Sequence, residues 1–230
     1  MILLPRTPSQ TASELAAGFA TASAIHLINY HATPRVHAAR YRAQINAMAG
    51  RFASLAHRGI DGLLAPSGAK PVLAPILFEG FRDNYDVMLP ILEAAGFAAW
   101  FFVPSHFINV PPARQRIFAA RHSLHYGADA YEGARIAMSW DELRDARARG
   151  HYVACHSRNH TALHPDTPDH ILHDEIITAK QELEEGLGAR VDTFCYLHGA
   201  EFGLNPRADR MLIKAGYQYL FSNFRLQKIQ

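Results

Sequence analysis

Two histidines four residues apart, His156 and His160, are the residues whose types and spacing point most directly to chemistry. They follow a short apolar run, residues 151–155, which predicts a strand that ends just before them. In α/β folds, ligand sites are built from residues that emerge at the ends of strands. Imidazole is a common ligand of zinc and related ions, so the pair predicts a metal site. Because the chain has 14 histidines, the competing interpretation is a pair that only hydrogen-bonds to backbone.

The elements that must position this pair alternate between apolar runs and helix-like segments, which is typical of a parallel α/β fold. The predicted strands are residues 24–30, 71–78, 97–103, 151–155, 191–197 and 217–221. The predicted helices are residues 38–56, ended by Gly59; 84–95, with Asp83 as N-cap; a segment begun by a capping box at Ser139; 168–187, with Glu182, Glu184 and Glu185 facing water; and 206–215. Residues 109–137 show no clean period and predict a long irregular excursion. About six strands are too few for an eightfold barrel, so a partial or distorted barrel is the predicted fold.

Length and composition predict one soluble domain over residues 1–230, large enough to bury about 70 to 75% of its unfolded surface. A net charge of +2 without a basic stripe argues against a nucleic-acid partner. No run approaches the roughly 18 apolar residues of a membrane span, and the first apolar residues are too few for a signal peptide, so a cytoplasmic protein is expected. Cys155 and Cys195 lie in apolar runs and are expected to be buried, reduced thiols. These properties leave the oligomeric state open.

Six blocks of the chain carry a family resemblance. They are Asn29–His31, Ile76–Tyr85, Ala99–Ile108, Met138–Leu143, Gly150–His160 and Phe194–Gly199, within a core of about residues 24–222. In this order they resemble successive motifs of the polysaccharide deacetylases, carbohydrate esterase family 4. The resemblance implies a distorted, incomplete (β/α) barrel, TIM-like and seven-stranded in the family. It also implies removal of acetyl groups from sugars with a divalent metal, most often zinc.

The resemblance implies a metal held by one aspartate and two histidines, with a second aspartate as base. The family's usual text at the second strand is Thr-Phe-Asp-Asp-Gly, and an ungapped alignment places Phe78 and Glu79 at the two aspartates. Glu79 would then join His156 and His160 as a metal ligand, a known catalytic zinc set. The base would be missing, because phenylalanine accepts no proton. A one-residue deletion would instead place Glu79 at the base position, but it would flip the alternation of every residue beyond it, so the ungapped alignment is preferred.

The predicted rim of the site also departs from the family. In the block 194–199, Leu197 and His198 replace a proline and an aromatic residue, although the backbone N–H at position 198 remains available to an oxyanion. The candidate catalytic residues are Glu79, through its carboxylate, and His198. An imidazole such as that of His198 titrates near neutral pH and could serve as acid or base. The family's final Leu-x-His does not occur after residue 221. Three residues at strand ends are candidate substrate-binding residues, and they are His31, His106 and Tyr196.

Two functions of different classes follow from these features. The first is a metal-dependent hydrolase that removes an N-acyl group from a sugar or polysaccharide intermediate, for example in the synthesis of an O-antigen-like or capsule-like surface polysaccharide. The second is a catalytically degenerate module that binds a glycan or a partner protein. Loss of a general base costs a factor of about 10² to 10⁴, which is severe without abolishing catalysis. The enzyme is therefore the preferred interpretation.

Overall fold

The computed structural model describes residues 25–54, 70–127, 131, 134–223 and 226–229. Its centre is a curled sheet with the strand order β1-β3-β4-β5-β6-β7-β8, and the short β2 also pairs with β3. The strands are β1 (Ile25–Tyr30), β2 (Ala53–Ser54), β3 (Val72–Phe78), β4 (Trp100–Val103), β5 (Tyr152–Cys155), β6 (Thr193–Cys195), β7 (Tyr219–Phe221) and β8 (Leu226–Lys228). All pairs are parallel except β7 with β8. This is an incomplete barrel, and all six predicted strands are present in it.

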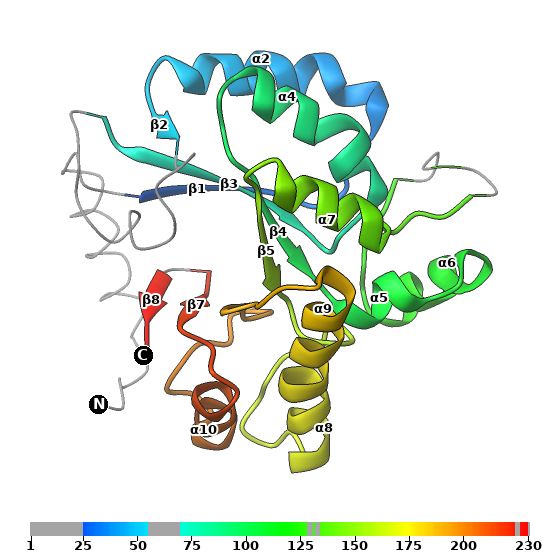
Figure 1. The fold of residues 1–230 in the computed structure, drawn as a ribbon, viewed down its shortest axis with the longest axis vertical. Coiled ribbons are helices and arrows are strands. Elements are labelled where there is room, and N and C mark those ends of the chain that lie inside the picture. Colours follow the sequence, from blue (N-terminus) through cyan, green and yellow to red (C-terminus); the bar gives the residue numbers. More distant parts are fainter. Residues whose placement is uncertain (1–24, 55–69, 128–130, 132–133, 224–225, 230) are drawn as a thin grey trace.

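Helices cover the outer face of the sheet along the whole path (Figure 1). They are α2 (Ala38–Ala49), α4 (Leu89–Ala94), α5 (Ser105–Asn109), α6 (Pro112–Arg121), α7 (Trp140–Ala148), α8 (Asp169–His173), α9 (Ala179–Leu187) and α10 (Pro206–Lys214). A short 3₁₀ turn, Arg35–His37, precedes α2, and π-helical turns, Asn84–Met88 and Asp174–Thr178, lead into α4 and α9. Of these helices none is long and apolar enough to cross a membrane.

The alternation of side chains along the strands divides the apolar residues into two cores. Leu73 and Leu77 of β3 face outward into the large core beneath the helices. Ala74 and Ile76 face inward into a smaller cluster with Trp100 and other strand residues. Successive side chains of a strand point to opposite faces, so a strand buried on both faces needs an almost continuous apolar sequence. Both cysteines are buried and free, as the sequence predicted.

Two predicted helix boundaries are wrong. The helix predicted over residues 38–56 ends at Ala49, because the N–H groups of Arg51 and Phe52 both turn back to the carbonyl of Met48. Residues 53–54 then join the sheet as β2, while Gly59 lies outside the described residues. Asp83 does not cap its helix, since its own backbone is helical (φ −67°, ψ −21°) and its side chain makes no cap bond. Its carboxylate instead accepts a hydrogen bond from Thr33 Oγ1 at 3.4 Å.

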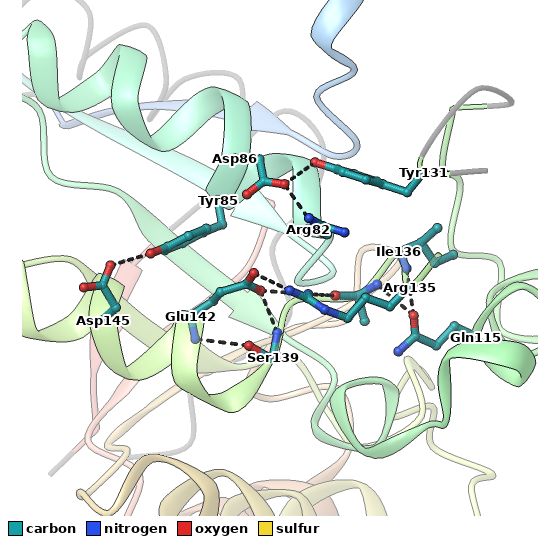
Figure 2. A network of polar contacts seen from close by, with 11 residues as sticks. Arg82, Tyr85, Asp86, Gln115, Tyr131, Arg135, Ile136, Ser139, Glu142 and Asp145 are labelled. Carbon is teal, nitrogen blue, oxygen red and sulfur yellow. Dashed lines mark hydrogen bonds and ion pairs between the residues drawn. The ribbon is translucent and has the colours of Figure 1, made fainter. Parts of the chain in front are cut away.

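The capping box is present, with both of its hydrogen bonds between Ser139 and Glu142. The excursion predicted over residues 109–137 is wrong in part, because it contains the ten-residue helix α6. Gln115 on α6 is buried, and its amide oxygen accepts the N–H of Ile136 at 2.8 Å (Figure 2). Figure 2 also shows Tyr131 donating to Asp86 at 2.7 Å, which ties the same segment to the helix after β3. These contacts fix α6 against the body of the protein.

Candidate active site

Strand register brings the candidate residues together at one edge of the sheet. Tyr30 pairs with Leu77, so the residues that follow them, His31 on one strand and Phe78 and Glu79 on the next, emerge side by side. Cys155 ends β5 at the same edge, and the segment 156–160, here called the histidine loop, begins there. The site therefore lies at the carboxyl ends of the parallel strands, where α/β folds place their ligands.

Four residues of this edge have a left-handed backbone that side chains rarely adopt. Their φ angles are 72° at Glu79, 62° at Ser157, 58° at His160 and 51° at His198. Such conformations cost roughly 1 to 3 kcal/mol each and are concentrated at functional sites. Here the turn at Glu79 is held by its N–H, which donates to the carbonyl of Phe102 at 2.7 Å. The backbone is thus strained where the candidate ligands are presented.

Glu79 lies at the centre of the site with its carboxylate buried at 2% exposure. Its Oε1 is 2.9 Å from His31 Nδ1 and 3.7 Å from His160 Nε2. Its Oε2 is buried and has no hydrogen-bond partner. An unpaired buried carboxylate oxygen is costly, so this atom requires a partner that the protein itself does not supply.

The two histidines of the loop are oriented by backbone carbonyls. His156 Nδ1 lies 3.1 Å from the carbonyl of Cys195, and His160 Nδ1 lies 2.8 Å from that of His122. A carbonyl only accepts, so each Nδ1 carries the proton, and Nε2 of the neutral ring is free to bind a cation. The two rings are 5.2 Å apart between centroids. The backbone-bonded interpretation of this pair is therefore also true, and it is compatible with a metal site.

Burial keeps both rings in the form that binds metals. It lowers the pKa of His156 well below its ordinary value, and the neighbouring His160 lowers that pKa further. Burial also lowers the pKa of His160. The hydrogen bond to Glu79 raises the pKa of the exposed His31, which favours its protonated form. The site thus combines two neutral imidazoles, one carboxylate and one more basic imidazole at its edge.

A test of these residues as a metal site gives two results. As the side chains stand, no group of three or more His, Cys, Asp or Glu within the described residues has the arrangement to hold a metal ion. The Oε1 atom of Glu79 lies closer to His31 Nδ1, at 2.9 Å, than to His160 Nε2, at 3.7 Å. The donor types nevertheless fit a divalent cation, because the unpaired Oε2 and two neutral imidazoles oriented through Nδ1 form a His₂Glu set.

Phe78 forms an apolar wall beside these residues. Its ring centroid lies 5.1 Å from that of His31, with the planes only 16° apart, and 5.1 Å from that of His156. It also packs edge-on against Phe102 at 5.3 Å. Within the histidine loop, the side chain of Phe78 lies next to His156, whereas that of Glu79 lies nearest to His160. The position expected to hold a base is filled by a ring that accepts no proton.

A buried carboxylate that the sequence reading did not single out holds the histidine loop. Glu175 is 2% exposed, and its Oε2 accepts the N–H groups of Arg158 and Asn159, both at 2.8 Å. Its Oε1 accepts the amide of Asn159 at 2.9 Å. The signal for this role was present, because Glu175 lies three residues after the buried Leu172, on the apolar face of its helix.

The water-facing role predicted for the glutamates of α9 is wrong for Glu182. Its carboxylate accepts the hydroxyl of Ser105 at 2.6 Å and pairs with the guanidinium of Arg158 at 2.8 Å. Glu184 accepts the N–H of Val191 at 2.9 Å, which leaves Glu185 exposed. The helix was correctly predicted, but its polar face lies against the loops that follow β4 and β5.

The remaining candidates occupy three different places. His198 is exposed, and its ring lies 5.5 Å from that of His160, at the mouth of the site. Tyr196 is buried in the outer core, with its hydroxyl 3.4 Å from Asp209. The expectation that it lines the mouth of the site differs from this placement. His106 bonds to Asn159 at 2.7 Å and lines a neighbouring pocket.

Comparison with known proteins identifies the family. Residues 75–220 match the family model for polysaccharide deacetylase, a segment that contains Glu79, the histidine loop and His198. The chain belongs to the polysaccharide deacetylase family. This membership places it among the carbohydrate deacetylases, which are hydrolases. A sequence comparison with curated proteins found no significant match.

Solved structures of deacetylases share the fold of this family member. The deacetylase PplD of Streptococcus pyogenes, in complex with acetate, aligns with a TM-score of 0.63 at 16% identity, over 84% of this chain and 80% of that one. A de-N-acetylase from Aggregatibacter actinomycetemcomitans aligns at 0.64 and 14% identity, over 89% and 90%. IcaB from Ammonifex degensii aligns at 0.59 and 16% identity, over 87% and 86%. At these identities the likeness shows the incomplete barrel.

Proposed function

We propose that this polysaccharide deacetylase family member is a metal-dependent N-deacetylase that hydrolyses the acetamide of a sugar within a glycan. Glu79, His156 and His160 would hold the metal, and zinc suits this donor set best. When bound, the metal supplies Lewis-acid polarisation of the amide carbonyl and a water of lowered pKa. A glycan made for the cell surface is the proposed substrate, and the cytoplasm the proposed location.

The observation that carries this proposal is the buried, unpaired Oε2 of Glu79. It lies on a carboxylate next to two imidazoles whose Nδ1 atoms are held by carbonyls. Burial of such a group would be unfavourable unless a cation paired with it. The strained backbone at both ends of the set supports the same interpretation, because strain is retained where it positions functional groups.

The chain's own residues then divide the remaining work. His31 orients Glu79 through its Nδ1 and stacks over Phe78, so it is one of the titratable groups beside the proposed base position. His198 stands on the other side of His160 and is proposed to move a proton to or from the substrate nitrogen. The backbone N–H of His198 is the proposed donor to the developing oxyanion. Phe78 excludes water from the wall between them.

Phe78 also favours a second function, the catalytically degenerate glycan-binding module. A ring at the base position removes the group that usually takes the water's proton, and a factor of about 10² to 10⁴ in rate goes with it. A module that retained the pocket and lost the reaction would keep the same fold and the same ligand set. The two functions differ only in turnover.

The test is metal content measured together with acetate release. The protein is stripped with a chelator, reloaded with zinc, and given N-acetylglucosamine oligomers. We expect about one zinc per chain and acetate release that disappears with the metal. Zinc without acetate from any sugar supports the binding module, and absence of zinc contradicts the ligand assignment.

Variants make the test specific to the site. Glu79→Gln and His160→Ala should lose zinc and acetate release together. His170→Ala is the matched control, because His170 is exposed on α8 and is not one of the candidate site residues. His31→Ala and His198→Ala should keep zinc and lose turnover. Full turnover in both would contradict their assigned roles.

A further inference from the structure

A second pocket, of about 550 Å³, lies beside the active site. It is an open pocket bordered by α5, α6 and the histidine loop, and its lining includes His106, Val110, Arg114, Phe118, Arg121 and Asn159. Helix α5 begins two residues after β4 ends, so the pocket is at the same carboxyl edge of the sheet as the site. Figure 1 shows α5 and α6 beyond the ends of β4 and β5. Its volume suits one sugar ring with a substituent.

The segment that builds this pocket has a strong positive bias. Residues 104–128 contain three arginines and three histidines and no aspartate or glutamate, whereas the whole chain has a net charge of only +2. The lining that is given by the structure contains no carboxylate. A cavity with one sign of charge attracts ligands of the opposite sign.

Two arginines of the pocket have no ion-pair partner in the part of the chain that the structure describes. Across the described residues, no carboxylate lies within ion-pair distance of Arg114 or Arg121, and both side chains are exposed. Arg116, between them on α6, differs, since it donates to the carbonyl of Ala134 at 2.8 Å and of Tyr131 at 2.7 Å. Gln115 also holds the back of the helix. The helix is therefore fixed by the adjacent residues Gln115 and Arg116, whereas the guanidinium groups of Arg114 and Arg121 are exposed.

The rest of the lining is apolar and aromatic. Phe118 forms part of it, stacked on His122 at 4.2 Å between ring centroids. Ile117, one of the few large apolar side chains that are exposed, lies at 54% exposure at the edge. A surface of C–H groups and rings beside guanidinium forks is suited to a sugar ring that carries an anionic group.

The pocket is joined to the active site by hydrogen bonds. The carbonyl of His122 orients the proposed ligand His160 at 2.8 Å. His106 Nδ1 contacts Asn159, one residue before His160, at 2.7 Å. A ligand in the pocket would therefore lie next to the histidine loop, which carries the proposed ligands His156 and His160.

From these contacts we infer that the pocket is a subsite for an anionic sugar residue, with Arg114 and Arg121 binding its carboxylate or phosphate. The inference rests on the proposed deacetylase function and specifies its substrate, a glycan in which an acidic residue neighbours the N-acetylated one. Guanidinium groups bind both anions in the same forked geometry, so the two sources must be separated by experiment.

Binding is measured by calorimetry on the protein kept metal-free with a chelator, so that no turnover occurs. The probes are a tetrasaccharide of alternating N-acetylglucosamine and glucuronate, and the neutral N-acetylglucosamine tetramer. We expect the acidic probe to bind about tenfold more tightly, with a difference that shrinks at high salt. A second pair, N-acetylglucosamine 6-phosphate against N-acetylglucosamine, shows whether phosphate is preferred to carboxylate.

The double variant Arg114→Gln with Arg121→Gln should bind acidic and neutral probes equally. The double variant to lysine should retain part of the preference, since the charge remains. Arg42→Gln on α2 is the matched control and should behave as the wild type, because Arg42 is exposed on a different helix. Melting temperatures of all variants show that each is folded.

Two results would overturn the inference. One is equal affinity of the wild type for acidic and neutral probes, and the other is a preference that survives in the folded glutamine double variant. Acetate release from the neutral tetramer, measured separately with zinc, tests the proposed function. If no acetate is released but the preference for the acidic probe is observed, the proposed reaction is refuted and the anionic subsite is supported.

Discussion

Replacing Phe78 with aspartate should increase the rate of deacetylation. Phe78 lies between His31 and His156 and directly precedes Glu79, at the position that the ungapped alignment gives to the family's base. A carboxylate there could accept a proton from water in the site. If the ungapped alignment is correct, this one substitution restores what the chain lacks.

The size of the gain can be set against its cost. A positioned general base contributes a factor of about 10² to 10⁴, or about 2.7 to 5.4 kcal/mol of transition-state stabilisation. The ring of Phe78 packs against Phe102 and two histidines but is only partly buried, so its loss should cost about 3 kcal/mol, the lower end of the range for buried phenylalanine. A domain of this kind is stable by about 5 to 15 kcal/mol, so the variant should remain folded.

The assay is acetate release at saturating zinc over a range of pH, with metal content measured on the same samples. Phe78→Asn is the matched control, because it has the shape of aspartate without a charge, and Phe78→Leu reports the loss of the ring alone. Only the aspartate variant should gain activity, and its gain should grow as pH rises and the carboxyl ionises.

Equal rates for the aspartate and asparagine variants, both folded and loaded with zinc, would refute the reasoning. That result would mean that the wild type already has a base, either a histidine of the rim or Glu79 in the gapped alignment. A gain that appears equally in all three variants would show that the ring only obstructs the substrate.

Three further predictions concern the frame of the site. Glu175→Gln should lower the free energy of unfolding by about 2 to 3 kcal/mol in a denaturant titration and weaken zinc binding, whereas exposed Glu185→Gln should do neither. Gly80→Ala should be destabilised by about 1 to 3 kcal/mol with loss of activity, because φ is +65° and the new Cβ would lie 3.2 Å from an α5 side chain; an unchanged melting temperature would contradict this. Although burial raises it, hydrogen bonds from Arg149 and a neighbouring histidine bring the pKa of Glu93 below its ordinary 4.5. The difference in free energy of unfolding between the wild type and Glu93→Gln should therefore be largest above about pH 4.5 and should decrease as pH falls through the lowered pKa. A difference that does not depend on pH would refute this prediction.

Local pattern alone was enough to predict most of the architecture. Apolar runs placed the six predicted strands, because a strand buried on both faces must be apolar throughout, whereas the short β2 and β8 were not predicted. The capping box at Ser139 was correctly read, since both of its hydrogen bonds form within one helical turn. Helix α6 was missed, because it is held by Gln115 and Arg116 reaching distant backbone and shows no clean apolar period.

The sequence by itself also determined the chemistry available, namely two histidines and a glutamate at strand ends with a phenylalanine directly before the glutamate. Tertiary structure decided how these groups meet. Register placed His31 against Glu79, and Glu175 from a helix late in the chain fixed the histidine loop. It also turned Tyr196 into the outer core and gathered two free arginines into a pocket beside the site. The sequence gives the residue types directly. Contacts between residues far apart in the chain depend on strand order and helix packing, which no local sequence pattern specifies.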